Sequence, residues 1–223
     1  VGEVVATSIE DVVPALTRVE EATASGCWAV GYVGYEAAPA VDSRLVVQSR
    51  RSDSIHGDLP LVWFGLFATR VLNPDPDLDL GDYELSDWQW VDDREAYERA
   101  VETVREHIAA GDVYQVNFTT RLRAAFAGDP VAFYHDLAAA QSGGYGTYLD
   151  TGRYRIVSAS PELFFDRHPG RGGRDRLVTR PMKGTAARGR WPAEDLTHLR
   201  ALETSEKERA ENLIIVDLIR NDL

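Results

Sequence analysis

The sequence predicts an α+β protein in which mainly antiparallel sheets are flanked by helices. Segments whose apolar residues have helical spacing are interspersed with short runs of β-branched and aromatic residues. Several of these runs follow one another directly between residues 145 and 179, as antiparallel strands joined by turns do. The composition, 44% hydrophobic and 27% charged over 223 residues, is that of a globular protein able to bury a core.

The first elements are predicted from periodicity and from turn residues. Apolar residues with helical spacing predict a helix from Ser8 to Ser25. Aromatic and β-branched runs predict strands over Cys27–Glu36 and Pro60–Val71, with a polar loop over Val41–Asp58 between them. The turn-rich segment Asn73–Asp77 is a predicted linker.

This linker divides the chain into a predicted N-terminal substructure, residues 1–76, and a second part, residues 77–223. In the second part, helices are predicted at Asp93–Ala110, Asp129–Gln141 and Thr204–Asn221. Strands are predicted at Asp112–Arg123, Tyr145–Leu149, Tyr154–Ser160, Glu162–Asp166 and Arg176–Thr179, with a turn at Pro169–Arg174.

The last predicted helix is apolar on nearly every side, which is typical of a buried helix. It runs almost to Leu223 without a glycine cap or a following element. We therefore expect the domain to be truncated at Leu223. The 223-residue chain alone is expected to be inactive and prone to associate, because apolar helix surface would be exposed.

Charge and cysteine content narrow the class of protein. With 36 acidic against 24 basic residues the formal net charge is −12, which argues against nucleic acid and anionic membranes as partners. The sequence has neither an apolar run of the ~20 residues that a membrane span needs nor a signal peptide. Cys27 is the single cysteine, which excludes an internal disulfide and suits the cytoplasm.

Two segments contain residues suited to acid–base or nucleophilic chemistry. Glu162, in Ser-Pro-Glu at the start of a strand, is a candidate general acid, and the alternative is a solvated edge carboxylate. Lys183 lies between Pro-Met and Gly-Thr on a constrained turn. It is either a candidate nucleophile or an exposed, anion-contacting lysine.

Glu208 and Glu211 lie three residues apart on one helix face and could bind Mg²⁺, which prefers oxygen ligands. Glu208 also fits a capping box with Ser205, and Glu211 fits an i,i+4 ion pair with Lys207. Gln115 lies in a predicted alternating strand and is either a structural hydrogen-bonding residue or a polar group of the site.

Four stretches, in this order, together resemble the chorismate-using enzymes: GDVYQVNFTTRL, SASPELFF, TRPMKGTAARG and SEKERAENLIIVDLIRNDL. The phrases GYVGYEAAPAVD and DLPLVWFGLF are similar to N-terminal segments of the same family. The resemblance implies the N-terminal part of the anthranilate synthase component I-like fold, with the catalytic domain incomplete.

The resemblance is greatest to the aminodeoxychorismate synthases, which convert chorismate and ammonia to 4-amino-4-deoxychorismate for folate synthesis. Isochorismate and salicylate synthases have Lys at the position of Gln115, and anthranilate synthases usually have Ala at that of Lys183. By resemblance, Lys183 attacks C2 of chorismate to form a covalent intermediate, and Glu162 is the acid toward the C4 hydroxyl. Gly184 and Thr185 line the ring.

The same resemblance implies that Glu211 and Glu208 help to bind the Mg²⁺ that holds the substrate carboxylate. Cys27 lacks the context of a glutaminase nucleophile, so ammonia is expected from a glutamine amidotransferase partner. The alternatives are an anthranilate synthase component I and a non-catalytic fragment of the family.

Overall fold

A computed structural model describes residues 2–48, 57–72, 79–141, 144–170, 172 and 174–223. These residues fall into two compact units. Unit 1 comprises residues 1–79 with 148–157, and unit 2 comprises residues 80–147 with 158–223. The predicted linker at Asn73–Asp77, and with it the predicted boundary between residues 76 and 77, lies outside the described residues.

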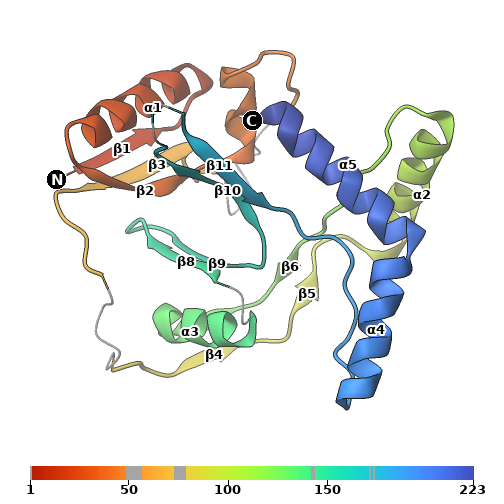
Figure 1. Ribbon diagram of the computed structural model, residues 1–223. Coiled ribbons are helices and arrows are strands. Elements are labelled where there is room, and N and C mark those ends of the chain that lie inside the picture. Colours follow the sequence, from red (N-terminus) through yellow and green to blue (C-terminus); the bar gives the residue numbers. More distant parts are fainter. Residues whose placement is uncertain (1, 49–56, 73–78, 142–143, 171, 173) are drawn as a thin grey trace. The chain divides into compact units, whose positions relative to one another are not determined.

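Unit 1 is built on a three-stranded antiparallel sheet with the strand order β1-β3-β2. The strands are β1 (Gly2–Ala6), β2 (Trp28–Val33) and β3 (Val62–Phe67). Helix α1 (Ile9–Ala24) lies across one face of the sheet (Figure 1). The core between helix and sheet consists of buried small and β-branched side chains: Val4, Ala6, Val12, Ala15, Ala37, Leu61 and Val62.

The predicted strand over Cys27–Glu36 ends earlier than its aromatic residues suggest. After β2 the chain turns into a 3-10 helix, η1 (Tyr35–Ala40). Ala37 of η1 is buried in the core, whereas Tyr35 is exposed. The small residues of this segment pack against α1, and this tertiary contact prevails over the strand propensity of Tyr35.

Unit 2 begins with short strand pairs and two helices. Strand β4 (Tyr83–Leu85) pairs with β7 (Phe126–Gly128), and β5 (Gln89–Trp90) pairs with β6 (Leu122–Arg123). Helix α2 (Arg94–Ala110) is capped as its sequence predicts, since the Asp93 carboxylate accepts from the Ala96 N–H at 2.6 Å and Gly111 is left-handed with φ 81°. Helix α3 (Pro130–Gln141) packs against β4, where Phe133 contacts Tyr83 edge to face.

Two hairpins follow α3. Strand β8 (Tyr145–Asp150) pairs with β9 (Arg155–Ser160), and β10 (Leu163–His168) pairs antiparallel with β11 (Arg176–Arg180). The chain then forms helix α4 (Pro192–Thr204) and helix α5 (Glu206–Asp222), which contact one another and are the two blue helices of Figure 1. All four of these strands were predicted, whereas α4 was not.

One prediction in unit 2 is wrong. Residues 112–121 form no strand, although they alternate, because no described strand pairs with them and only Leu122 and Arg123 join a ladder. Apolar surface of helix α5 is exposed, as expected for this chain alone: Leu213 is 71% exposed, and α4 is the main helical neighbour of α5. Strands β4, β5 and β7, of two or three residues each, were missed because they are short, and β1 was also missed. Among the described residues no helix is both long and apolar enough to cross a bilayer.

Substitutions in α1 test whether its buried face packs against the sheet of unit 1. Val12 is 0% exposed, whereas its neighbour Val13 is 48% exposed. Val12→Ala is expected to lower the free energy of unfolding by about 1.5–3 kcal/mol, because it removes two buried methyl groups and leaves a cavity. Val13→Ala is the control and should change it by less than about 0.5 kcal/mol. Equal effects in urea melts would show that α1 does not pack as described.

Candidate functional site

The register of the β10–β11 hairpin brings two of the predicted segments together. Leu163 pairs with Arg180, so Glu162 and Pro181 lie side by side where the two strands meet their flanking segments. Pro181 has no N–H to continue the ladder. The next amide, that of Met182, donates instead to Oε1 of Glu162 at 3.0 Å. The predicted acid is therefore hydrogen-bonded to the residue that precedes the predicted nucleophile.

The local turn at Ser160-Pro161-Glu162 is closed by the serine hydroxyl. Ser160 Oγ donates to the Glu162 carbonyl at 2.9 Å and accepts from the Glu162 N–H at 3.2 Å. This pair of bonds fixes the backbone from which the Glu162 side chain extends. Glu162 is half-buried, so the structure supports a placed carboxylate rather than a freely solvated edge residue.

Lys183 is half-buried, and its ammonium group contacts an amide. Its Nζ donates to Oδ1 of Asn117 at 3.3 Å. Asn117 was not among the predicted site residues. The signal that could have found it is its spacing, because it stands two positions after Gln115 in the same segment, and both are amides next to apolar residues.

Gly184 holds the turn at a conformation that other residues rarely adopt. Its φ is +76°, in the left-handed region. A Cβ at this position would lie 2.9 Å from Oε2 of Glu208. The glycine therefore permits both the turn after Lys183 and the close approach of the Glu208 carboxylate. Thr185 follows Gly184 and is exposed.

Gln115 is half-buried, and its Oε1 is fully enclosed. Among the described residues no donor lies within hydrogen-bonding distance of this oxygen. A buried acceptor without a donor is costly, so this oxygen needs a partner such as water or an ion, or has a functional role.

The structure separates the alternatives for Glu208. Ser205 is the N-cap of α5, and its Oγ accepts from the Glu208 N–H at 3.3 Å. The other half of a capping box would have the Glu208 carboxylate accept the Ser205 N–H, but that N–H donates to the Ala201 carbonyl at 3.1 Å. The serine half of the box is formed, and the Glu208 carboxylate is left for other contacts.

The carboxylates of Glu208 and Glu211 both lie near the ammonium group of Lys207. Lys207 Nζ lies 3.8 Å from an oxygen of each carboxylate, so the predicted i,i+4 pair of Glu211 with Lys207 is present. These distances exceed those of a hydrogen bond, and the Lys207 side chain is exposed. The ammonium group is therefore a weak counter-ion that a divalent cation could displace.

The two carboxylates fit Mg²⁺ only as a partial ligand set. In the part of the chain that the structure describes, no cluster of three or more His, Cys, Asp or Glu residues could hold a metal ion. Magnesium ions commonly bind one or two carboxylates and complete their shell with water and substrate oxygens. Glu208 and Glu211 have the right donor atoms and spacing for that arrangement.

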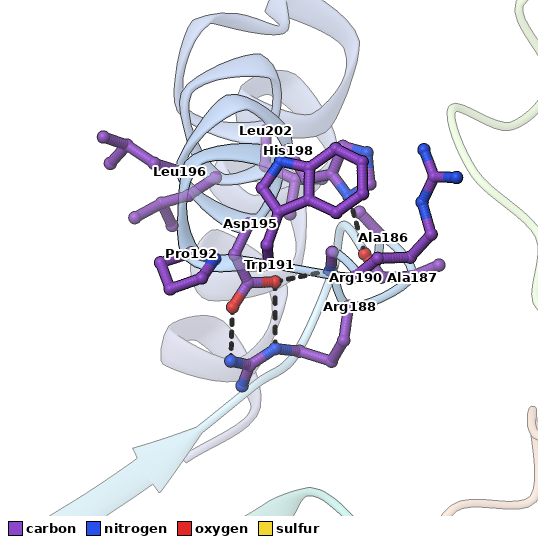
Figure 2. Close-up of a pocket in the computed structure, with 12 residues that line it drawn as sticks. Ala186, Ala187, Arg188, Arg190, Trp191, Pro192, Asp195, Leu196, His198 and Leu202 are labelled. Carbon is purple, nitrogen blue, oxygen red and sulfur yellow. Dashed lines mark hydrogen bonds and ion pairs between the residues drawn. The ribbon is translucent and has the colours of Figure 1, made fainter.

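The loop after Thr185 folds back on α4 and forms a pocket of about 710 Å³. The Asp195 carboxylate accepts the Gly189 N–H at 2.6 Å. It also pairs with the Arg188 guanidinium, as Figure 2 shows. His198 Nδ1 lies 2.8 Å from the Ala187 carbonyl oxygen. None of the seven predicted site residues lines this pocket.

Chemically, the Lys183 turn combines an amine, a carboxyl group and, beyond Gly184, a second pair of carboxylates. An amine held on rigid backbone can act as a nucleophile when it is neutral, and a carboxylic acid can protonate a leaving group. A cation between Glu208 and Glu211 would attract an anionic substrate to the same turn. The arrangement suits an anionic substrate with a leaving hydroxyl.

A family model described as chorismate binding enzyme matches residues 69–223. Among curated proteins, the aminodeoxychorismate synthase of Streptomyces griseus is 41% identical over 133 residues, which are 59% of this chain and 18% of that protein. Anthranilate synthase component 1 of Thermus thermophilus is 42% identical over 130 residues, 58% of this chain and 27% of that protein. Aminodeoxychorismate synthase component 1 of Escherichia coli is 39% identical over 140 residues, which are 62% of this chain and 29% of that protein.

The structure of anthranilate synthase component I from Streptococcus pneumoniae TIGR4 superposes with a TM-score of 0.66 at 24% identity, covering 88% of this chain and 49% of that one. This likeness confirms the predicted α+β fold. The chain spans about half of that structure and between 18% and 29% of the three curated relatives above.

The Asp195 clamp on the loop predicts a pH dependence. Hydrogen bonding from the Gly189 N–H, and then from Arg188, lowers the pKa of the Asp195 carboxyl below its ordinary value of 3.8. Because the folded-state pKa lies below the unfolded one, the clamp stabilises the loop above pH 3.8 and is lost as the pH falls through the lowered pKa. Protection of the Gly189 amide from hydrogen exchange should therefore decrease as the pH is lowered below 3.8.

Asp195→Asn should reduce Gly189 protection severalfold at neutral pH and remove most of its dependence on acid. Glu203→Gln, an exposed substitution on the same helix, is the control and should leave both unchanged. If acid and Asp195→Asn both leave Gly189 protected, the carboxylate does not hold the loop.

Proposed function

This chain belongs to the chorismate binding enzyme family, and from this premise we propose that it forms part of an aminodeoxychorismate synthase component I. The reaction joins chorismate and ammonia to give 4-amino-4-deoxychorismate and water, toward folate. The relatives with this name match the chain at 39% and 41% identity.

The observation that carries the proposal is the hydrogen bond from the Met182 amide to Glu162, which joins the predicted acid to the turn that contains Lys183. Lys183 and Lys207 are the only lysines among the 24 basic residues of the sequence, and all the others are arginines. Arginine stays protonated at any accessible pH and cannot be a nucleophile, whereas lysine can lose its proton. A lysine on the turn, hydrogen-bonded to Asn117, fits a nucleophile better than a mere source of positive charge.

In the proposed first step, neutral Lys183 Nζ forms a bond to C2 of chorismate. The ring double bonds shift, the C4–O bond breaks, and the proton of Glu162 accompanies the hydroxyl as it leaves as water. Glu162 reaches the same turn through its bond with the Met182 amide, so acid and nucleophile are held by one hairpin end. The product of this step is a covalent lysine adduct, and Glu162 is left ionised.

In the second step, ammonia attacks C4, the double bonds shift back, and the Lys183–C2 bond breaks. Nitrogen thus replaces oxygen at C4. The proton that the attached nitrogen loses returns to the ionised Glu162, and Lys183 is regenerated with its electron pair. Ammonia is an N–H donor, and the enclosed Oε1 of Gln115 is an acceptor that no described residue satisfies. Gln115 is therefore proposed to orient ammonia, with Gly184 and Thr185 beside the ring.

Glu211 and Glu208 are proposed to hold Mg²⁺, which would supply a positive charge for the substrate carboxylate. The close approach of Glu208 to Gly184 connects these carboxylates to the Lys183 turn. Ammonia is proposed to come from a glutamine amidotransferase subunit. Cys27, the single cysteine, is in unit 1 at the start of a strand, in no context that would make it a glutaminase nucleophile.

Anthranilate synthase is the second candidate, because relatives with that name are equally similar, at 42% in Thermus thermophilus. The two activities differ in product. Chorismate, ammonia and Mg²⁺ are incubated with the protein expressed from its complete coding sequence, and products are identified by mass and retention. 4-Amino-4-deoxychorismate supports the proposal, anthranilate supports the second candidate, and unchanged chorismate supports a non-catalytic member.

Substitutions at Lys183 separate a nucleophile from a positive charge. Lys183→Ala and Lys183→Arg should both lower kcat by about 10²-fold or more, because neither can form the covalent bond. Lys183→Arg keeps the charge, so it is the matched control for an electrostatic role. Substantial retention of turnover by Lys183→Arg would contradict the covalent mechanism. A lysine adduct in the wild-type protein, trapped by rapid quench and found by mass spectrometry, would support it.

Glu211→Gln tests the metal site. It should raise the Mg²⁺ concentration needed for half-maximal activity by tenfold or more, on the order of the loss expected from a removed ligand. Glu206→Gln, an exposed change on the same helix, should leave the Mg²⁺ dependence as it was. If Glu211→Gln lowers the melting temperature while the Mg²⁺ dependence is unaltered, Glu211 only pairs with Lys207.

A further inference from the structure

The Lys183 turn is tied to α5 by one side chain that the proposed mechanism does not use. Asn212 Nδ2 donates to the Lys183 carbonyl oxygen at 3.2 Å and to the Glu208 carbonyl oxygen at 3.0 Å. A primary amide has two N–H groups, so both can be used in this bridge. We infer that Asn212 is a positioning residue for Lys183, a role that rests on the proposed function.

The orientation of α5 supports a specific role for this amide. Asn212 is half-buried, whereas the adjacent Leu213 is 71% exposed. The polar residue thus faces inward and the apolar one outward, the reverse of what hydrophobic burial alone favours. Asparagine is also a poor residue for the interior of a helix. The two hydrogen bonds offset these costs, and one of them reaches a residue 29 positions away.

The bridge acts on the backbone atoms next to the proposed nucleophile. The Lys183 carbonyl is held by Asn212, and the following residue, Gly184, is packed against the Glu208 side chain. The turn is therefore held against α5 from two sides. At the other end of the lysine, Nζ contacts Asn117. Because both the backbone carbonyl and the Nζ of Lys183 are hydrogen-bonded, the position of the amine is fixed relative to a bound ring.

The same bridge links the two halves of the proposed site. Asn212 follows Glu211 directly and bonds to the carbonyl of Glu208, so the residues proposed to hold Mg²⁺ and the Lys183 turn share one rigid connection. Loss of the bridge should misplace the amine relative to a substrate held at α5. Misplacement by about 1 Å can cost about 10²-fold in rate.

The test uses Asn212→Leu, which is similar in shape but has no N–H donor, in the protein expressed from its complete coding sequence. Lys183 and Lys207 are acylated with acetic anhydride, and the rate at each lysine is followed by peptide mass spectrometry. Lys207 is exposed on α5 and serves as the internal reference. In Asn212→Leu the Lys183 rate, relative to Lys207, should rise severalfold, because the freed turn loses the contact with Asn117.

Activity gives the second measurement. At saturating Mg²⁺, Asn212→Leu should lower kcat about 10- to 100-fold and leave KM for chorismate within about twofold, since the amine moves while substrate binding does not. Asn221→Leu, near the end of the same helix, is the control and should change neither measurement. Asn212→Gln keeps an N–H donor, so its kcat should lie between those of the wild type and Asn212→Leu. If Asn212→Leu does not fold, Asn212→Gln is used for both measurements instead.

The outcomes are distinguishable. A wild-type relative rate of Lys183 acylation in both Asn212 variants would overturn the positioning role, and so would losses of kcat and KM that merely follow a lower melting temperature. If the wild-type protein makes no 4-amino-4-deoxychorismate, the proposed function fails. The acylation experiment then still decides whether Asn212 positions Lys183, because it needs no turnover.

Discussion

The pairing of β10 with β11 is the constraint on which the candidate site depends. Because Leu163 lies opposite Arg180, the Ser-Pro-Glu turn that enters one strand and the Pro-Met-Lys turn that leaves the other are neighbours. Pro181 stops the ladder at this point, and the next free amide binds the Glu162 carboxylate instead. A shift of the register by one residue would place the two segments out of reach of this bond and turn their side chains to opposite faces.

Helix α5 forms the second support of the same turn. Its N-terminus is capped by Ser205, which orients the first turn and with it Glu208. The Glu208 side chain then approaches Gly184, whose φ of +76° is a conformation that favours glycine. Asn212 closes the contact with a hydrogen bond to the Lys183 carbonyl. The acid, the amine and the carboxylates thus come from three separate segments, which are held together by the β10–β11 pairing and by hydrogen bonds between side chains and backbone.

Much of this could be predicted from local sequence. The caps of α2, the proline at the start of α3 and the strands of the two hairpins follow from local rules, and all are present. Residues 112–121 could not be predicted in the same way, since an alternating segment is a strand only if another strand pairs with it.

By itself, the sequence determined the α+β class, most of the elements and the residue types able to do chemistry, such as Glu162 and Lys183, because these depend on local patterns and on side-chain chemistry. Only the tertiary structure decided which partners those residues have. It left the Glu208 carboxylate free of the capping box, and it brought Asn117 and Asn212 to Lys183. The physical reason is that hydrogen bonds between residues far apart in the chain depend on strand register and helix packing, which no local pattern encodes.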